Sequence, residues 1–137
     1  MRLTLLAASL ILSLGCTGPK KATMNPAKLN GSWVPVQQEI GGKALPKTVY
    51  ENERLVIADS NYVLTAESTD KGVVRCKDNK MDIYGREGVN AGKHFTAIYK
   101  LEGGQLTICY NLRGDSYPTS FVTDAQPALF LSVYKKE

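Results

Sequence analysis

HFTAIYKLEGGQLTICYN, residues 94–111, is the most informative stretch of the chain, because it consists of two alternating runs joined by a pair of glycines. Apolar side chains recur at every second position of each run, which is the period of a β-strand with one buried face. Gly103 and Gly104 favour a tight hairpin turn, since glycine readily adopts the positive φ angles of such turns. The stretch therefore predicts an antiparallel hairpin. The positions expected to share its buried face are Phe95, Ala97, Tyr99, Leu101, Leu106, Ile108 and Tyr110.

Similar short runs recur from Gly31 onward at a spacing of roughly 8–12 residues, which is typical of an all-β sandwich or barrel. Turn-forming pairs between the runs favour antiparallel neighbours. We therefore predict an all-β fold, an eight-stranded antiparallel up-and-down barrel with one short helix at 46–51, whose interior holds side chains or one small ligand. The strands are expected at 32–40, 54–58, 62–67, 73–77, 81–84, 94–101, 105–111 and 128–134, and Leu129, Leu131 and Val133 are expected to share a buried face of the last.

The N-terminus has the organisation of a bacterial export signal. Arg2 is followed by an apolar run of about 12 residues, which suits a signal peptide but is shorter than the roughly 20 that cross a membrane. The run ends in Ser13, Leu14, Gly15 and Cys16, which resemble the lipobox of bacterial lipoproteins, where the cysteine receives a diacylglycerol group. The resemblance implies that residues 1–15 are removed and that Cys16 is lipidated. The alternative is an ordinary signal peptide followed by an incidental cysteine.

The rest of the chain divides into a tether and one domain. Residues 16–28 carry two prolines and three lysines without apolar periodicity, and we expect a flexible tether there. Residues 29–137 are enough for a single barrel with a buried core. The implied location is the cell envelope, at the periplasmic face or the outer membrane, with the N-terminal lipid in the membrane. The 17 basic and 13 acidic residues of the chain are interleaved, so we expect no nucleic-acid partner, and we expect a monomer.

A family resemblance begins at Gly31, Ser32 and Trp33, the Gly-x-Trp that opens the first strand of lipocalin-like barrels. The chain resembles the small lipocalin-like domain of unknown function found in planctomycete-type bacterial proteins, over 29 to about 136. The resemblance implies the barrel fold and no particular activity. It also implies that Trp33 seals one barrel end beneath a cation of the last strand, where this chain offers Lys135, or Lys136, instead of the usual arginine. The other matching segments are 42–46, 81–83, 92–93, 98–101, 106–110 and 118–121.

The sequence shows no pattern typical of a catalytic or metal site. His94 is the single histidine, it has no adjacent nucleophile, and no metal-binding spacing of Cys or His occurs, so we expect no cofactor, no metal and no enzymatic activity. Asp82 lies between Met81 and Ile83 in a predicted strand and therefore faces the other way. It is either a solvated carboxylate or the polar contact of a pocket.

Two cysteines remain after Cys16, and an oxidising compartment permits a disulfide between Cys76 and Cys109. In an up-and-down barrel they lie on the fourth and seventh strands, about three steps of 4.8 Å apart along the wall. A disulfide needs Cα atoms within about 4.4–6.8 Å. The alternative is two buried thiols.

Tyrosines supply the candidate contacts for a ligand or a partner. Tyr99 and Tyr110 lie in predicted strands, whereas Tyr117 and Phe121 lie in a long connection, 111–127, of the kind that is often functional. In the family Tyr117 is commonly an arginine, so no anion-binding role is carried over to it. We expect a non-enzymatic module that binds a small apolar or amphipathic ligand in the barrel. The alternative is an envelope protein-interaction or inhibitor module that uses the 111–127 loop, and an enzyme ranks third.

Overall fold

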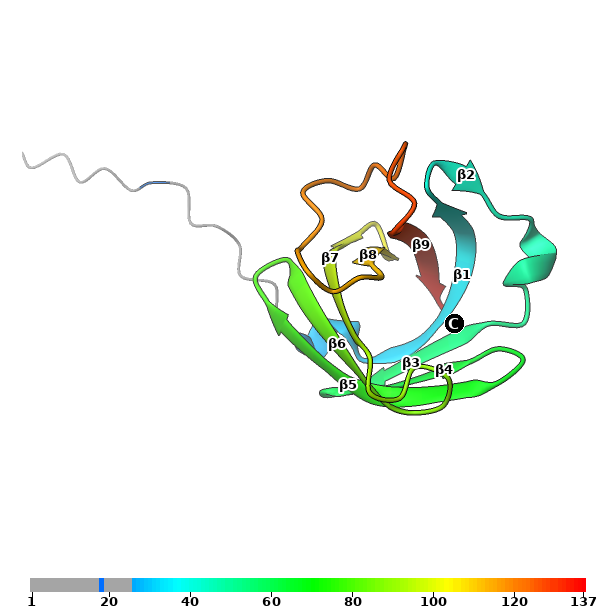
Figure 1. Cartoon of the computed structure of the whole chain (residues 1–137). Helices are drawn as coiled ribbons and strands as arrows, with labels where there is room; N and C mark the ends of the chain where they lie inside the picture. The colour runs from blue at the N-terminus through cyan, green and yellow to red at the C-terminus, as the bar shows by residue number, and fades with distance from the viewer. Residues whose placement is uncertain (1–17, 19–25) are drawn as a thin grey trace, which may run out of the picture.

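The computed structural model describes Gly18 and residues 26–137, and the predicted signal peptide, Cys16 and most of the predicted tether lie outside the described residues. The described part is an all-β protein (Figure 1). No helix in it is long and apolar enough to span a membrane. Its strands are β1 (Gly31–Ile40), β2 (Lys43–Ala44), β3 (Arg54–Ala58), β4 (Asn61–Thr65), β5 (Thr69–Lys77), β6 (Lys80–Glu87), β7 (His94–Glu102), β8 (Gln105–Asn111) and β9 (Leu129–Lys136).

Eight of these strands form a closed antiparallel barrel, as predicted. The order around the barrel is β1-β3-β4-β5-β6-β7-β8-β9, and β9 pairs back with β1 from Trp33↔Lys136 to Ile40↔Phe130. Closure leaves no long unpaired edge in the wall. The two-residue strand β2 pairs with the end of β1 and was not predicted, because it is too short to show any alternation.

The helical segments are single turns of 3-10 helix. The predicted helix at 46–51 is reduced to η2 (Lys47–Val49), preceded by Pro46 in an extended conformation. A second turn, η1 (Pro26–Leu29), leads into β1 where the sequence predicts the end of a flexible tether. Leu29 is only 1% exposed, and burial of this side chain in the barrel core accounts for the ordered turn.

One end of the barrel is closed. Trp33 is buried there, its indole N–H donates to the Leu29 carbonyl at 2.8 Å, and the Lys136 ammonium lies 5.5 Å from the centre of its ring. The cation expected above Trp33 is therefore Lys136, and the assignment to Lys135 was wrong. Lys135 pairs with Val34 one position along the strand, so its side chain points to the opposite face.

The predicted core face of the last strand is also wrong. Ile108 and Tyr110, which face the core, are paired with Ser132 and Phe130, so the even-numbered residues of β9 point inward. Leu131 and its alternate neighbours are on the outside, where the connection at 112–128 packs over them. This wall is apolar on both faces, and a periodicity of two then cannot distinguish inside from outside. The outer cluster consists of Ile98, Cys109, Leu129 and Leu131, with Tyr117 and Phe121 packed against it.

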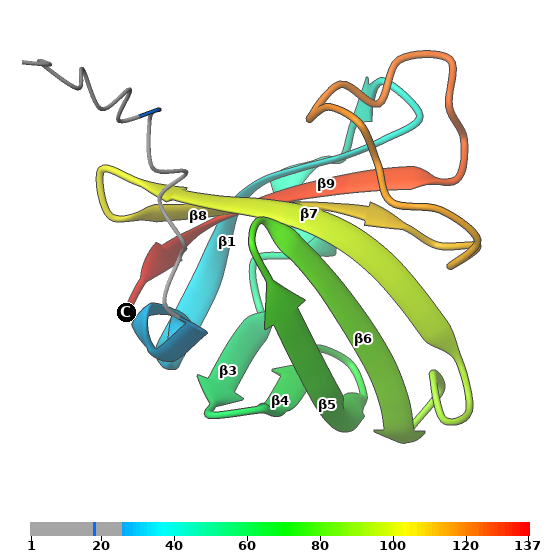
Figure 2. The same cartoon turned by 90° about the vertical axis from the view of Figure 1, so that its left-hand side faces the viewer.

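The opposite end of the barrel is open. The β6–β7 and β8–β9 connections lie at this end, whereas η1, the C-terminus and the β7–β8 hairpin lie at the closed end (Figure 2). The described segment 26–137 therefore begins and ends at the closed end of the barrel.

Candidate functional site

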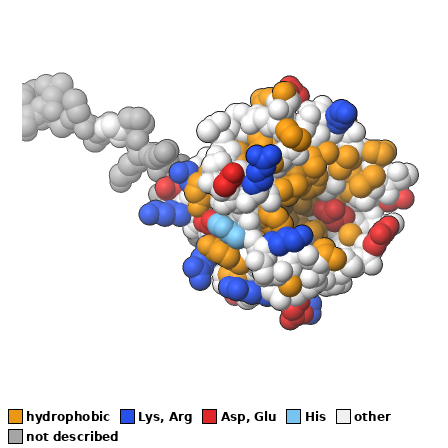
Figure 3. Space-filling model, viewed as in Figure 1, with side chains coloured by type: hydrophobic (Ala, Val, Ile, Leu, Met, Phe, Trp, Pro, Cys, Tyr) orange, Lys and Arg blue, Asp and Glu red, His pale blue; other side chains and the backbone are white. Residues whose placement is uncertain are grey.

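A cavity of about 440 Å³ occupies the barrel and opens at the end away from Trp33. The space-filling view looks into this hollow, which hydrophobic side chains surround (Figure 3). The barrel interior is therefore hollow, and its volume lies within the range of about 300–1,000 Å³ that is usual for small-molecule sites. The apolar and aromatic side chains that line it are Leu55, Ile57, Tyr62, Leu64, Val74, Met81, Ile83, Phe95, Ile108, Tyr110, Leu112, Phe130 and Tyr134, and Glu53, Asn90 and Lys93 complete the lining.

The β6–β7 connection is held at the cavity mouth by a buried carboxylate. Asp70 accepts hydrogen bonds from the Asn90 backbone N–H at 3.1 Å and from its side-chain amide at 3.3 Å. Gly88 has a φ of +91°, and a Cβ atom there would lie 2.3 Å from Asp70 Oδ1. Glycine is thus required by both backbone conformation and close approach. The contacts fix Asn90 where it lines the cavity, and the neighbouring Lys93 is exposed at the same mouth.

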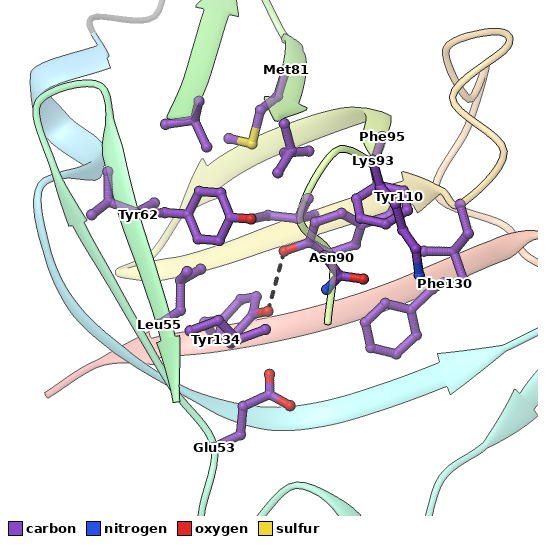
Figure 4. A pocket seen from close by; sticks show the side chains of 16 residues that line it. Glu53, Leu55, Tyr62, Met81, Asn90, Lys93, Phe95, Tyr110, Phe130 and Tyr134 are labelled. Carbon is purple, nitrogen blue, oxygen red and sulfur yellow. Dashed lines mark hydrogen bonds between the residues drawn. The ribbon is translucent and has the colours of Figure 1, made fainter. Parts of the chain in front are cut away.

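One side of the interior carries a polar network. Gln38 is 2% exposed, and its side-chain amide donates to Glu53 Oε1 at 3.0 Å and to Ser132 Oγ at 3.2 Å. Tyr110 and Tyr134 join their hydroxyls at 3.3 Å in the cavity wall. Figure 4 shows the hydroxyl of Tyr62 directed toward this pair from the other side of the cavity. The apolar chamber therefore has polar groups gathered on the side of β1, β3, β8 and β9.

Burial raises the pKa values of the ionisable groups in this network. The pKa of Glu53 is raised because its carboxyl loses water, although the hydrogen bond from Gln38 acts in the opposite direction. Burial raises the pKa of Tyr134 to about 12 and that of Tyr110 well above its ordinary value, and it also raises the pKa of Tyr62. The three phenols are therefore neutral hydrogen-bonding groups at physiological pH.

Tyr110 is the only one of the five predicted contact residues that lines the cavity. Tyr99 is 1% exposed, but it lies outside the cavity lining and donates its hydroxyl to the Asp78 carbonyl at 3.0 Å. Its ring fills the barrel toward the closed end instead of contacting the open chamber. Alternation identified the correct face of the strand for Tyr99, but it contains no information about depth along the barrel axis.

Asp82 and Tyr117 meet on the outer surface of the barrel. The Tyr117 hydroxyl donates to Asp82 Oδ2 at 2.7 Å, and the other carboxylate oxygen lies 2.8 Å from His94 Nε2. The hydrogen bond to Asp82 raises the pKa of the Tyr117 phenol. The His94 ring stacks on Tyr84 with centroids 4.6 Å apart. Asp82 is thus neither a solvated strand carboxylate nor a cavity group: it fastens the 111–127 loop to the outer wall.

Phe121 lies in the same loop, outside the cavity. It packs against the outer apolar cluster, and the Lys100 ammonium lies 4.8 Å from its ring centre. Together with Tyr117 it covers the outer wall, which leaves the cavity mouth to other residues.

The two described cysteines are free thiols, so the structure does not contain the disulfide that the sequence left open. Cys76 packs against the inner core, and Cys109 belongs to the outer cluster, so the two lie on opposite faces of the wall. Burial raises the pKa of Cys76, and it raises that of Cys109 to about 11. Between Gly18 and the C-terminus the described residues contain no group of three or more His, Cys, Asp or Glu side chains that could hold a metal ion.

Glu53, Tyr62, Phe130 and Tyr134 are among the cavity residues that sequence reasoning did not single out. Glu53 precedes β3 in a turn, where no alternation predicts its direction. Tyr62 and Tyr134 belong to the set of seven tyrosines, which was the available signal, but only barrel closure brings them to one chamber. Comparisons with protein-family models, with curated proteins and with solved structures found no match to this chain.

Proposed function

We propose that the barrel is a non-enzymatic binding module for a small apolar or amphipathic molecule. The observation that carries this proposal is the open cavity of about 440 Å³ with its mainly apolar walls. Water in such a chamber finds few hydrogen-bonding partners, so its replacement by an apolar molecule is favourable. A barrel that served only as a rigid support would be expected to fill this space with larger side chains.

The first test uses the uncharged dye Nile red and two variants of neighbouring residues on β5. Val74 lines the cavity, whereas Val73 points to the outer surface. Val74→Phe places a ring in the chamber, and we expect it to weaken dye binding at least about tenfold. Val73→Phe adds the same ring outside and should leave dye binding unchanged. Equal binding by both variants and the unmodified protein would show that the dye does not occupy the cavity.

A second test looks for the natural occupant. Protein extracted from its source is examined by native mass spectrometry, and we expect a small molecule to remain bound to the folded protein. The mass should disappear in the Val74→Phe variant and persist in Val73→Phe. If the source protein carries no ligand and also fails to bind Nile red, the proposal is wrong.

We also propose that the module is a lipoprotein of the cell envelope, held to a membrane by a lipid on Cys16. The apolar run before this cysteine and the lipobox resemblance support the proposal. Metabolic labelling with radioactive palmitate should mark the protein, and Cys16→Ser should abolish the label. Labelling that survives this substitution would contradict anchoring through Cys16.

The alternative function, a protein-interaction or inhibitor module that uses the 111–127 loop, has weaker support. Tyr117 and Phe121 were its expected contact residues, and both pack against the outer wall of the barrel. A partner that used these side chains would have to compete with the contacts they already make.

A further inference from the structure

The polar side of the cavity contains hydrogen-bonding capacity that the described protein groups do not use. Glu53 Oε1 accepts from Gln38, and within residues 26–137 the structure records no donor to Oε2. Glu53 nevertheless lines the cavity, and Figure 4 shows its carboxyl directed toward the Tyr110–Tyr134 pair. One acceptor oxygen therefore remains for a ligand.

The tyrosines supply the complementary donors. A hydrogen bond between two hydroxyls uses only one of their two hydrogens, so the Tyr110–Tyr134 pair keeps one O–H to donate. In the described part of the chain the Tyr62 hydroxyl has no recorded acceptor either. Two O–H groups thus face the chamber.

We infer that the cavity selects apolar molecules that carry an uncharged hydroxyl group, an inference that rests on the ligand-binding function proposed above. A hydroxyl both donates and accepts, so it donates to Glu53 and accepts from the tyrosine hydroxyls. Its apolar skeleton lies against the opposite wall, which Val74, Met81 and Ile83 provide.

Charged head groups match this site less well. A carboxylate only accepts hydrogen bonds, and next to Glu53 it would place two acids together. An ammonium group is attracted by the Glu53 carboxylate, but it only donates, so it leaves the tyrosine O–H groups without an acceptor, and the loss of its water on entry opposes binding. Lys93 is exposed at the mouth, where water screens its charge, so it does not compensate for an acid that lies deeper in the chamber.

The experiment compares octanol, octanoate and octylamine, which share one alkyl chain, by competition with Nile red. We expect octanol to bind at least about tenfold more tightly than either charged compound. Tyr62→Phe removes one donor that has no protein partner and should weaken octanol binding by about three- to tenfold. Glu53→Gln removes the acidic charge and should bring octanoate closer to octanol.

Glu51→Gln is the matched control for the loss of charge, because Glu51 is exposed two residues before Glu53 and lies outside the cavity lining. This variant should preserve the order of the three compounds. Equal affinities, or preference for octanoate or octylamine in the unmodified protein, would overturn the hydroxyl assignment while leaving the binding function intact. That comparison needs no variant and so does not depend on the folding of any substitution. Failure of Nile red and all three compounds to bind would refute the binding function itself.

Discussion

Replacement of Trp33 by Phe tests whether the tryptophan at the closed end determines the stability of the barrel. Trp33 is 1% exposed, its N–H reaches the Leu29 carbonyl, and Lys136 covers its ring. Phenylalanine keeps an aromatic face for the lysine but removes the donor and part of the ring. The residue does not line the cavity, so the change separates stability from binding.

The expected loss has two main parts. A carbonyl left without its donor in this buried position costs about 1–3 kcal/mol. The smaller ring leaves a void whose lining loses its contacts, which costs about 1 kcal/mol more if the site relaxes partially. The interaction with Lys136 largely survives, because a cation also binds the face of phenylalanine. The free energy of unfolding should therefore fall by about 2–4 kcal/mol.

Urea unfolding followed by far-UV circular dichroism measures this loss, since the substitution removes the single tryptophan of the chain and with it the fluorescence signal. With a denaturant dependence of about 2 kcal/mol per molar urea, the midpoint should move by about 1–2 M. Nile red affinity should stay unchanged. The reasoning is refuted if the loss is below about 0.5 kcal/mol, which is the range of ordinary surface substitutions, or if dye binding falls in the folded variant.

Three further predictions concern the loop, the cavity acid and the thiols. Tyr117→Phe removes the hydroxyl that fastens the loop to Asp82, so trypsin should cleave more rapidly after Arg113, which is exposed in that loop. The free energy of unfolding should fall by about 1 kcal/mol. An unchanged cleavage rate would contradict the fastening role. Burial raises the pKa of Glu53, so the folded state holds this proton more tightly than the unfolded state, and its contribution to stability falls as the pH rises from the ordinary carboxyl value through the raised one. The free energy of unfolding of Glu53→Gln, relative to that of the unmodified protein, should accordingly be higher at neutral pH than below the ordinary carboxyl pKa. If urea unfolding gives the same difference between the two proteins at both pH values, this prediction is wrong. Cys76 and Cys109 should react slowly with a thiol reagent in the native protein and rapidly after denaturation without a reductant, with modified peptides identified by mass spectrometry; failure to react after denaturation would indicate a disulfide.

The fold was predictable because most strands have one buried face. The hairpin at 94–111 alternates cleanly, and the structure places Ala97 and Tyr99 inside as expected. The last strand could not be oriented in this way, because Leu131 is buried under the loop while Tyr134 is buried in the barrel. Lys135 and Lys136 could not be distinguished for a related reason, since the family pattern gives a cation near the end of the strand but not its register.

The site was less predictable, because it depends on how deep each side chain lies along the barrel axis and on which strands the closure of the barrel brings together. Tyr99 and Tyr110 share a face in the sequence pattern, yet only Tyr110 reaches the chamber. Glu53 precedes a strand, and its importance follows from Gln38 on another strand and not from any local motif. Asp82 and Tyr117 were both singled out, but no pattern in the sequence predicted that they would bind each other on the outside.

The loop packed over β7, β8 and β9 divides the barrel into two mechanically different halves. Strands that bury side chains on both faces lose more apolar contacts when they open than strands with one solvated face. The free energy of local unfolding should therefore be highest in this half. In the described residues the loop does not cover the wall of β3, β4 and β5. The strands β3 and β4 are shorter than β7 and β9, and β5 contains Gly72. We therefore expect that, when a molecule larger than the cavity mouth enters, the half covered by the loop keeps its position and the β3–β5 wall moves.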